Sequence, residues 1–473
     1  MSDNKKQEKD YTPEVTALLP EADALAKSGK LQEALDKLLA LEKLTRNAAD
    51  LSSTTKLSKA AIQHCYDARN YPLVNSTITL LSKKHGQLKA AIQAFVEQAI
   101  EWLPEIKERD GEERWLELLE TLRSVTEGKI FLETPRARVT LLLSHYHENL
   151  SLSSTAKDPK ESLQTASDLL SELQVETYSS MERREKTEFI LEQMRLLIQV
   201  ARQKDAEVGK KGTKDLLGGG EAEWVKVRVG GRKVNEEFLK EKDNEDLKLK
   251  YYDMMIQHAL NQDAYLDVAK YYYKVWETPS VKEDVNGKGK AALEHISYYM
   301  VLAPHTNEQS DMLHHLYVDP ALPKLELQYN LTKCFVTKEL MRWPGIESIY
   351  GKFLQKTPVF SQEKRWEDLH TRVIEHNIRV VAEYYTRITL VRLSSLLDLT
   401  PKETEAILSR LVVSGTVWAK IDRLAGIISF RAKRSTEDVM NDWSSDMQKL
   451  LSLVEKTWMG MNAAQAAQSR VKS

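Results

Sequence analysis

The chain has 473 residues, 42% of them hydrophobic and 29% charged, which is ordinary for a water-soluble protein of two or three domains or one extended repeat array. Lys and Arg total 68 and Asp and Glu total 70, so the net charge of −2 excludes a bulk electrostatic attraction to nucleic acid or to an anionic membrane. The two cysteines, Cys65 and Cys334, exclude a disulfide framework and favour a reducing compartment.

The N-terminal segment 1–10, MSDNKKQEKD, is hydrophilic, and we expect it to be disordered. It lacks the apolar stretch of a signal peptide. Nowhere do about 18 apolar residues follow one another as a membrane span requires. We therefore expect a soluble, intracellular protein without membrane contact.

Residues 11–203 are predicted to form an arm of helical repeats, because Leu, Ala, Glu and Lys recur with helical periodicity. Three stretches read as a helix, a tight polar turn and a second helix led by an aromatic residue or leucine: Ala22–Leu41, His64–Leu81 and Met255–Trp276. Hairpins that cannot bury their apolar faces alone stack into a solenoid, as in tetratricopeptide-like arrays. Generic helix packing is the alternative explanation of this weak similarity.

Further helices are predicted at 88–103, 112–126, 135–150, 160–174 and 182–203. Residues 204–222 interrupt the series with many charges and three consecutive glycines, a composition typical of a flexible insertion. A phosphate-binding loop is not favoured, because the GxxxxGK[ST] pattern and a preceding apolar strand are both missing. Helical repeats are predicted to continue over 223–365.

A compact domain is predicted over 366–434, and it opens with a helix over 366–388. The apolar residues of this helix recur at three- and four-residue spacing, as on a core-facing stripe. They are Val373, Ile374, Ile378, Val381, Tyr384, Tyr385 and Ile388. A short helix follows with Leu390, Leu393, Leu396 and Leu397 on one side.

The next helix is predicted to begin at Thr400, where Thr-Pro-Lys-Glu combines an N-cap, a proline at the first helical position and a capping-box glutamate. It ends at Gly415 and turns Ala406, Ile407, Leu408, Leu411 and Val412 inward. Alternation in 417–421 and extended structure in 427–430, separated by a turn, predict a hairpin. Helix, turn, helix and hairpin make a winged helix.

The charges of this winged helix do not favour nucleic-acid binding. Its second helix exposes two cations and two anions, namely Lys402, Arg410, Glu403 and Glu405. The wing is more basic, with Lys420, Arg423, Arg431, Lys433 and Arg434, but such runs are usually solvated edges. We instead assign Trp418, Lys420 and Arg423 to a partner-binding wing.

A final helix is predicted over 435–461, capped by Ser435-Thr436-Glu437-Asp438, with a frayed tail over 462–473. Apolar residues follow a near-heptad step along it: Val439, Trp443, Met447, Leu450, Val454 and Trp458. Such an exposed stripe would be costly, so we expect it to pack on helices of other chains. Folding back on its own domain is the alternative.

No catalytic, cofactor-binding or metal site is predicted. His145-Tyr146-His147 with Thr155 and Asp158 approaches the zinc signature of the JAMM metalloproteases, with threonine in place of serine. On the predicted helix, however, residues two apart point about 200° away from each other and cannot share one ion. His314-His315 fails in the same way. We expect no enzyme activity.

A helical arm that runs into a winged helix, with VIEHNIRVVAEYYTRITLVRLSSLLDLT at the junction and LVVSGTVWAKIDRLAGIISF at the end, resembles a PCI module. This module is shared by the proteasome lid, the signalosome and a translation initiation factor complex. Five further blocks resemble the family of PCI lid subunits numbered fifth among the non-ATPase subunits of the 26S proteasome regulatory particle, in its fungal form. They are ITLLSKKHGQLK, VTEGKIFLETPRARVT, SELQVETYSSME, LKLKYYDMMI and TKELMRWPGIE.

The resemblance implies a noncatalytic scaffold for ubiquitin-dependent degradation in cytoplasm and nucleus. It implies that the winged helix joins other PCI subunits and that the last helix enters a bundle shared with them and with metalloprotease-type lid subunits. It also implies that the arm reaches toward the ATPase ring or the core particle. The insertion 204–222 departs from the family, whose members we expect to be shorter there. A signalosome or initiation factor subunit, or a nucleic-acid-binding winged helix, remains the alternative.

Overall fold

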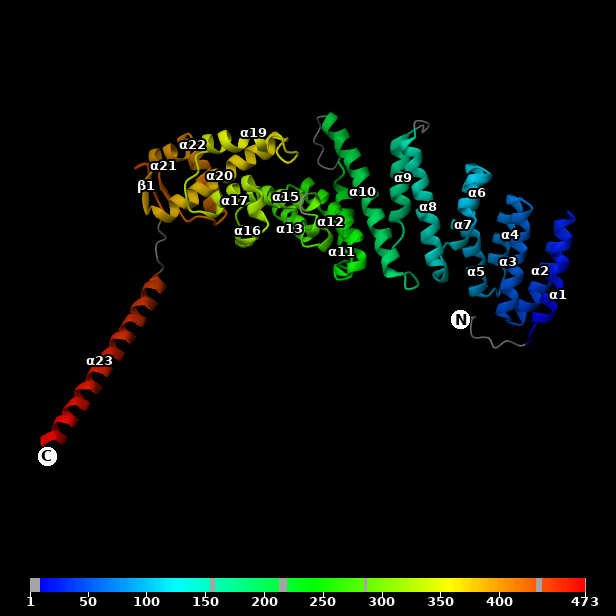
Figure 1. Cartoon of the computed structure of the whole chain (residues 1–473), viewed down its shortest axis with the longest axis horizontal. Helices are drawn as coiled ribbons and strands as arrows, with labels where there is room; N and C mark the ends of the chain where they lie inside the picture. Colours follow the sequence, from blue (N-terminus) through cyan, green and yellow to red (C-terminus); the bar gives the residue numbers. More distant parts are fainter. Residues whose placement is uncertain (1–8, 154–157, 212–218, 285–286, 431–435, 473) are drawn as a thin grey trace. The chain divides into compact units, whose positions relative to one another are not determined.

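The computed structural model describes residues 9–153, 158–211, 219–284, 287–430 and 436–472. The chain divides into two compact units, Met1–Gln262 and Asp263–Ser473. Within the described residues, helices make up most of both units, and the strands lie in the second (Figure 1). The predicted class, helical repeats followed by a winged helix with a small sheet, is confirmed.

Helices of the first unit pack mainly on neighbours that are close in sequence, as in a solenoid (Figure 1). They are α1 (Thr12–Lys27), α2 (Leu31–Asn47), α3 (Leu51–Asp67), α4 (Tyr71–Lys83), α5 (Lys89–Glu101), α6 (Leu103–Arg109), α7 (Glu112–Thr126), α8 (Glu133–Leu152), α9 (Pro159–Ser171), α10 (Arg183–Lys211), α11 (Glu221–Lys233) and α12 (Glu245–Asn261). Short 3₁₀ turns lie at Ile130–Leu132, Val175–Thr177, Phe238–Lys240 and Lys242–Asn244.

The three predicted helix–turn–helix stretches share one backbone feature. Gly29, Arg69 and Asp263 each adopt a positive φ, of 83°, 54° and 53°, two residues before the next helix begins. A left-handed residue after a helix reverses the chain and satisfies its last carbonyl groups. The turns between α1 and α2 and between α3 and α4 connect adjacent packed helices, whereas the third turn coincides with the boundary between the two units.

Residues predicted to be a flexible insertion are partly helical. The helix α10 extends through Lys211, and α11 begins at Glu221. The Asp205 carboxylate accepts hydrogen bonds from Gly220 N at 2.9 Å and from Trp224 Nε1 at 2.8 Å, and Lys204 binds Glu223 at 2.7 Å. A Cβ at Gly220 would lie 2.6 Å from the Ala201 carbonyl oxygen, so this close approach requires glycine. The charges that suggested a linker therefore join two helices.

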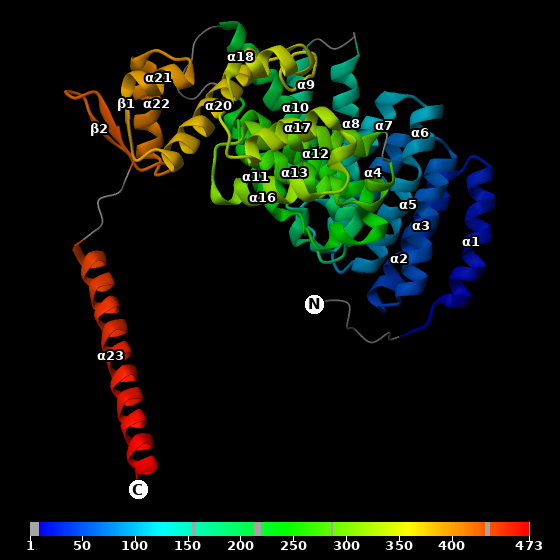
Figure 2. The same ribbon diagram turned by 60° about the vertical axis from the view of Figure 1, so that its left-hand side comes forward.

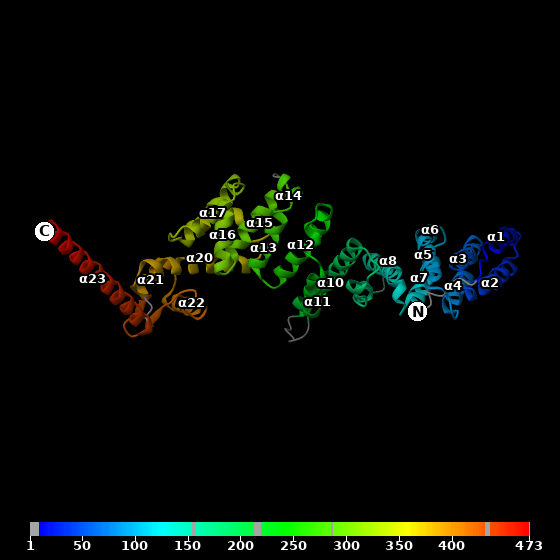
Figure 3. The same ribbon diagram turned by 90° about the horizontal axis from the view of Figure 1, so that it is seen from below.

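The second unit begins with helices that pack around α15, which contacts α13, α16, α17 and α20 (Figure 3). Its elements before the winged helix are α13 (Tyr265–Trp276), α14 (Pro279–Glu283), α15 (Lys288–Leu302), α16 (Asn307–Val318), a 3₁₀ turn (Leu322–Lys324), α17 (Glu326–Val336), α18 (Trp343–Ile346), a π-helical turn (Glu347–Gly351), α19 (Lys352–Leu354) and α20 (Glu363–Tyr384). Cys334 on α17 is half-buried, while Cys65 in the first unit is fully buried.

The winged helix follows α20 and contains α21 (Leu390–Leu397), α22 (Pro401–Val413) and three short antiparallel strands (Figure 2). They are β1 (Arg387–Thr389), β2 (Lys420–Asp422) and β3 (Ile427–Ser429), in the order β1-β3-β2. The register pairs Ile388 with Ile428 and Ile421 with Ile428. Ile374, Leu393, Leu408 and Ile428 are among the residues of one apolar core under this sheet.

The prediction of a helix through residue 388 is wrong. The helix α20 ends at Tyr384, and residues 387–389 form β1, so Ile388 is buried through the sheet rather than through the helical stripe. Tyr384 and Tyr385, predicted to face the core, are 67% and 41% exposed because the chain leaves the helix there to pair with β3. A three-residue strand is too short to show an alternating pattern.

The predicted N-terminus of α22 is confirmed in detail. Thr400 and Glu403 form the reciprocal capping box, with Pro401 in the first helical position. Gly415 has a φ of 74° after the helix, as the prediction of a C-terminal glycine requires. Ala406, predicted to face inward, is exposed, whereas Leu408 and Leu411 are buried as expected.

The last helix, α23, spans Thr436–Lys472 and is red in Figure 1. Ser435, the first residue of the predicted cap, lies outside the described residues. Residues 462–472 were expected to be frayed, but they continue the helix. Their alanine and glutamine residues have high helix propensity, which accounts for the continuation.

Candidate functional site

The predicted stripe on α23 is exposed along its length. Val439, Trp443, Met447, Leu450, Val454 and Trp458 are between 41% and 62% exposed. Each α-helical residue advances by about 100°, so these six residues share one face of the helix. The described part of the chain does not cover this apolar face.

Four large apolar residues on α23 were missing from the prediction. Met440, Leu451, Leu453 and Met459 are also more than half exposed. They widen the apolar surface beyond a narrow heptad seam, which fits insertion among several helices better than pairing with one. The sequence did contain a signal for these four residues, because each stands directly beside a residue of the predicted stripe.

The predicted wing residues lie beside and within β2. Trp418 is exposed just before the strand, and Lys420 is exposed at its start. Arg423 donates through Nε to Glu405 of α22 at 2.6 Å, so this cation is already paired within the winged helix. Arg431, Lys433 and Arg434 lie outside the described residues. Phosphate binding needs a surplus of unpaired cations, and Arg423 does not add to it because Glu405 neutralises its charge.

Three exposed apolar residues of the winged helix were missed by the sequence prediction. Val391 on α21, Val413 at the end of α22 and Leu424 in the turn between β2 and β3 project into solvent, and Leu424 is fully exposed. Only Leu424 carried a signal in the sequence, as a large aliphatic residue in a turn. Together with Trp418 they make the winged helix surface partly apolar, as on protein-binding surfaces.

The approach to a metalloprotease signature falls on a helix, as predicted. His145 and His147 both lie on α8, and Asp158 directly precedes α9; Thr155 lies outside the described residues. His145 Nε2 lies 3.0 Å from Glu192 Oε1, whereas the ring of His147 lies 5.6 Å from that of Tyr146. The two histidines therefore have separate partners. His314 and His315 are adjacent and exposed on α16.

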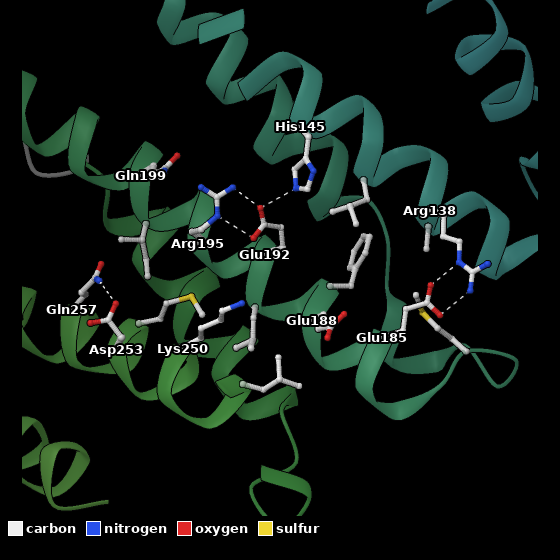
Figure 4. A pocket seen from close by; sticks show the side chains of 18 of the residues that line it. Arg138, His145, Glu185, Glu188, Glu192, Arg195, Gln199, Lys250, Asp253 and Gln257 are labelled. Carbon is white, nitrogen blue, oxygen red and sulfur yellow. Dashed lines mark hydrogen bonds and ion pairs between the residues drawn. The ribbon is translucent and has the colours of Figure 1, made fainter. Parts of the chain in front are cut away.

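His145 lines the edge of a groove of about 570 Å³ between α8, α10 and α12 (Figure 4). In Figure 4, Arg195 and His145 both approach Glu192. Arg195 forms two hydrogen bonds with Glu148, of 2.5 and 2.6 Å, and binds both carboxylate oxygens of Glu192. A second bidentate pair, Arg138–Glu185, with distances of 2.7 and 3.2 Å, lies farther along the groove.

Among the described residues, His145, Glu148 and Glu192 have the spacing of a possible cation site, with ligand atoms within 4.8 Å of one another. Arg195 already supplies the positive charge at this point. Burial raises the pKa of Glu192, but hydrogen bonds from His145 and Arg195 outweigh it and lower the pKa to about 2. The arrangement is a charge network that links α8 to α10, and it does not require an ion.

Three family models match consecutive parts of the chain. The PSMD12/CSN4 N-terminal model matches residues 33–284, the PCI domain model matches 329–432, and the model of the 26S proteasome regulatory subunit RPN5 C-terminal domain matches 437–458. The first description includes two proteins, so the C-terminal match and the full-length relatives distinguish between them. That match covers the exposed stripe of α23.

The relatives align over nearly the whole chain. The chain is 39% identical to 26S proteasome regulatory subunit RPN5 of Saccharomyces cerevisiae, over 95% of this chain and 94% of the yeast protein. The chain belongs to the RPN5 family. It is also 38% identical to the family members rpn501 of Schizosaccharomyces pombe and 26S proteasome non-ATPase regulatory subunit 12 of Dictyostelium discoideum, over 92% and 96% of this chain and 95% and 94% of theirs.

RPN5 family membership confirms the resemblance stated from the sequence blocks, and the relatives include fungal proteins as expected. None of the helices within the described residues combines the length and hydropathy that crossing a bilayer requires. The family models leave the last residues of α23, beyond residue 458, unmatched. The stripe from Val439 to Trp458 lies inside the matched part.

Proposed function

We propose that the chain is a noncatalytic scaffold subunit of the proteasome regulatory particle lid and assembles with other PCI subunits for ubiquitin-dependent degradation. The observation that carries this proposal is the exposed apolar face of α23, because it coincides with the RPN5 C-terminal match. A soluble chain rarely exposes so many large apolar side chains on one helix unless a partner covers them. The near full-length relatives, named as 26S proteasome regulatory subunits, supply the assembly.

We assign a separate role to each of three consecutive parts of the chain. Residues 11–203 and 223–365 form the arm, which reaches toward the ATPase ring or the core particle. The PCI winged helix, 366–434, joins neighbouring PCI subunits through Trp418 and Lys420. Residues 435–461 enter a helical bundle with other PCI subunits and with metalloprotease-type lid subunits. Arg423 contributes to the wing through its pair with Glu405.

The proposal also covers cofactors, cellular location and nucleic acid as a partner. The chain works without a cofactor, and the groove charges of α8 and α10 are used in mutual pairs. The protein acts in cytoplasm and nucleus. Nucleic acid is not its partner, because α22 presents balanced charges and Arg423 is paired with an acid.

The test is affinity purification of the full-length chain beside a version that ends at Arg434, each analysed by mass spectrometry. We expect the full-length chain to recover lid subunits and the shorter version to lose most of them. Recovery of signalosome, initiation factor or nucleic-acid complexes by the full-length chain would show that the assembly is wrong. Equal recovery by both versions would retain the assembly and exclude the bundle role of α23.

A further inference from the structure

The second unit contains a hollow of about 550 Å³ where α13 and α16 end and where α15 and α17 begin. Its floor is apolar, since Trp276 and Leu293 are almost fully buried there. Val318, at the end of α16, stands at its edge with 78% of its surface exposed. The hollow thus offers an aliphatic edge and a preformed floor of the kind that receives an apolar side chain.

Cations surround this floor. Lys282, Lys290 and Lys324 line the hollow from α14, α15 and the 3₁₀ turn before α17, and His315 adds an imidazole. Among the described residues, none of the three lysine ammonium groups has an ion-pair or hydrogen-bond partner. Three ammonium groups around one apolar hollow create a local positive potential, although the net charge of the chain is −2.

Asp319, the acidic residue of the lining, does not neutralise these lysines by direct contact. Its Oδ2 accepts a hydrogen bond from Trp276 Nε1 at 3.3 Å, and its Oδ1 accepts one from Ala321 N at 2.9 Å. Both oxygens are therefore used to hold the floor and the turn after α16. The lysines remain available to an outside anion.

The groove between α8, α10 and α12 in the first unit lacks such a surplus of cations. That groove is lined by four cations (Arg138, Arg195, Arg202 and Lys250) and four acids (Glu185, Glu188, Glu192 and Asp253), and two of its arginines bind acids directly. Opposite charges in balance do not select an acidic or a basic ligand. The hollow at Trp276 has three lysines against one engaged acid, which selects an acidic ligand.

We propose that this hollow docks an acidic peptide segment of a partner protein, with an apolar side chain against Trp276 and Leu293 and carboxylates beside Lys282, Lys290 and Lys324. Nucleic acid fits less well. A base needs an aromatic face to stack on. Trp276 is only 6% exposed, with its indole N–H bound to Asp319, and Tyr273, the other tyrosine or tryptophan of the lining, is half-buried. The hollow belongs to this chain alone, so peptide docking there does not require assembly into the proteasome.

The test is fluorescence anisotropy with the full-length chain and a short labelled peptide in which a Leu–Phe pair is flanked by runs of Asp and Glu. We expect saturable binding that weakens as salt is raised, because the lysines are exposed and screened. The triple variant Lys282→Gln, Lys290→Gln, Lys324→Gln should weaken binding about tenfold. Val318→Asp should also weaken it, since it places a carboxylate at the apolar edge.

A triple variant of equal charge is the control: Lys288→Gln, Lys333→Gln and Lys356→Gln remove three exposed lysines that lie outside the hollow. It should bind like the wild-type chain. The proposal fails if both triple variants lose affinity equally, if the Gln/Asn counterpart of the peptide binds as tightly, or if the peptide does not bind. Tighter binding of a single-stranded DNA of equal charge would assign the hollow to nucleic acid instead.

Discussion

Asn377 on α20 exchanges two hydrogen bonds with the backbone of Met341: its Oδ1 accepts from Met341 N at 2.8 Å, and its Nδ2 donates to Met341 O at 2.6 Å. Both residues are buried. Met341 belongs to the extended segment between α17 and α18, where no neighbouring strand pairs with its backbone among the described residues. The amide of Asn377 therefore takes the place of a neighbouring strand.

Replacing Asn377 by leucine should lower the free energy of unfolding by about 2–4 kcal/mol, because it leaves a buried N–H and a buried C=O without partners. Asn377→Asp should also destabilise, since a carboxylate cannot donate to Met341 O. The measurement is urea unfolding followed by circular dichroism. Asn330→Leu, on an exposed position of α17, is the control and should change stability by less than about 0.5 kcal/mol. Equal stability of the two leucine variants would contradict the role of the amide.

Trp443→Glu and Trp458→Glu on α23 should reduce the recovery of lid subunits strongly, because buried tryptophans dominate the binding energy of most protein interfaces. Ser445→Glu and Ser452→Glu, on the opposite face of the helix, are the matched controls. Neither pair should change the melting temperature of the isolated chain, since all four side chains are exposed. A lower melting temperature for the tryptophan variants alone would mean that the stripe packs on its own chain.

Burial, aided by the charge of Arg379, lowers the pKa of His376 to about 4. In the unfolded chain this histidine binds a proton near pH 6.5, but the folded chain binds it only near pH 4. Stability should therefore be complete above about pH 6.5 and fall as the pH drops toward 4, by about 3 kcal/mol from this group. Thermal unfolding between pH 7 and pH 4 measures this loss.

His376→Gln keeps a donor for the Glu339 carbonyl oxygen, which lies 3.3 Å from Nε2, and cannot be protonated in this range. In this variant, the melting temperature should fall less steeply as the pH is lowered from 7 to 4. His314→Gln, at an exposed position, should leave the slope as in the wild-type chain. If the two variants show the same slope, His376 does not titrate as its burial requires.

Arg195→Met should destabilise the first unit by about 1–3 kcal/mol, because Glu148 and Glu192 would keep their charges without the guanidinium between them. It should also raise the pKa of Glu192 from about 2. In the wild-type chain, the stability contributed by that low pKa is present above about pH 4.5 and lost toward pH 2, and the variant should lose less over this window. Arg202→Met on the same helix is the control, to be compared by thermal unfolding at pH 7 and pH 3.

Short sequence patterns correctly predicted the features of the fold that depend on only a few neighbouring residues, such as helix caps and turns. Thr400, Pro401 and Glu403 predicted the start of α22, and polar turns before Leu31 and Tyr71 predicted two helical hairpins. Caps and left-handed turns are formed within a few residues, so the sequence pattern contains them completely. Sequence blocks spread over the chain identified the family for the same reason, since each is a short continuous pattern.

Contacts between distant residues could not be read in this way. The strand β1 forms because residues 387–389 meet β3 about 40 residues later. Past residue 203, the helix α10 continues to where Asp205 accepts a hydrogen bond from Trp224 of α11. The His145-Tyr146-His147 pattern gave no hint of Glu192, which lies beside His145 from another helix, or of Arg195, which binds Glu192. Nor did any motif show that Lys282, Lys290 and Lys324 surround one hollow.

The sequence by itself determined the helical repeats, the winged helix, the apolar stripe of α23 and the family, because these depend on periodicity and on short continuous blocks. Only the tertiary structure decided where α20 stops and that Arg423 is paired with Glu405. It also decided that arginines of the first-unit groove bind acids, whereas the three lysines of the hollow at Trp276 do not. Whether a charge is paired depends on side chains that packing brings within about 4 Å, and no spacing along the chain encodes that distance.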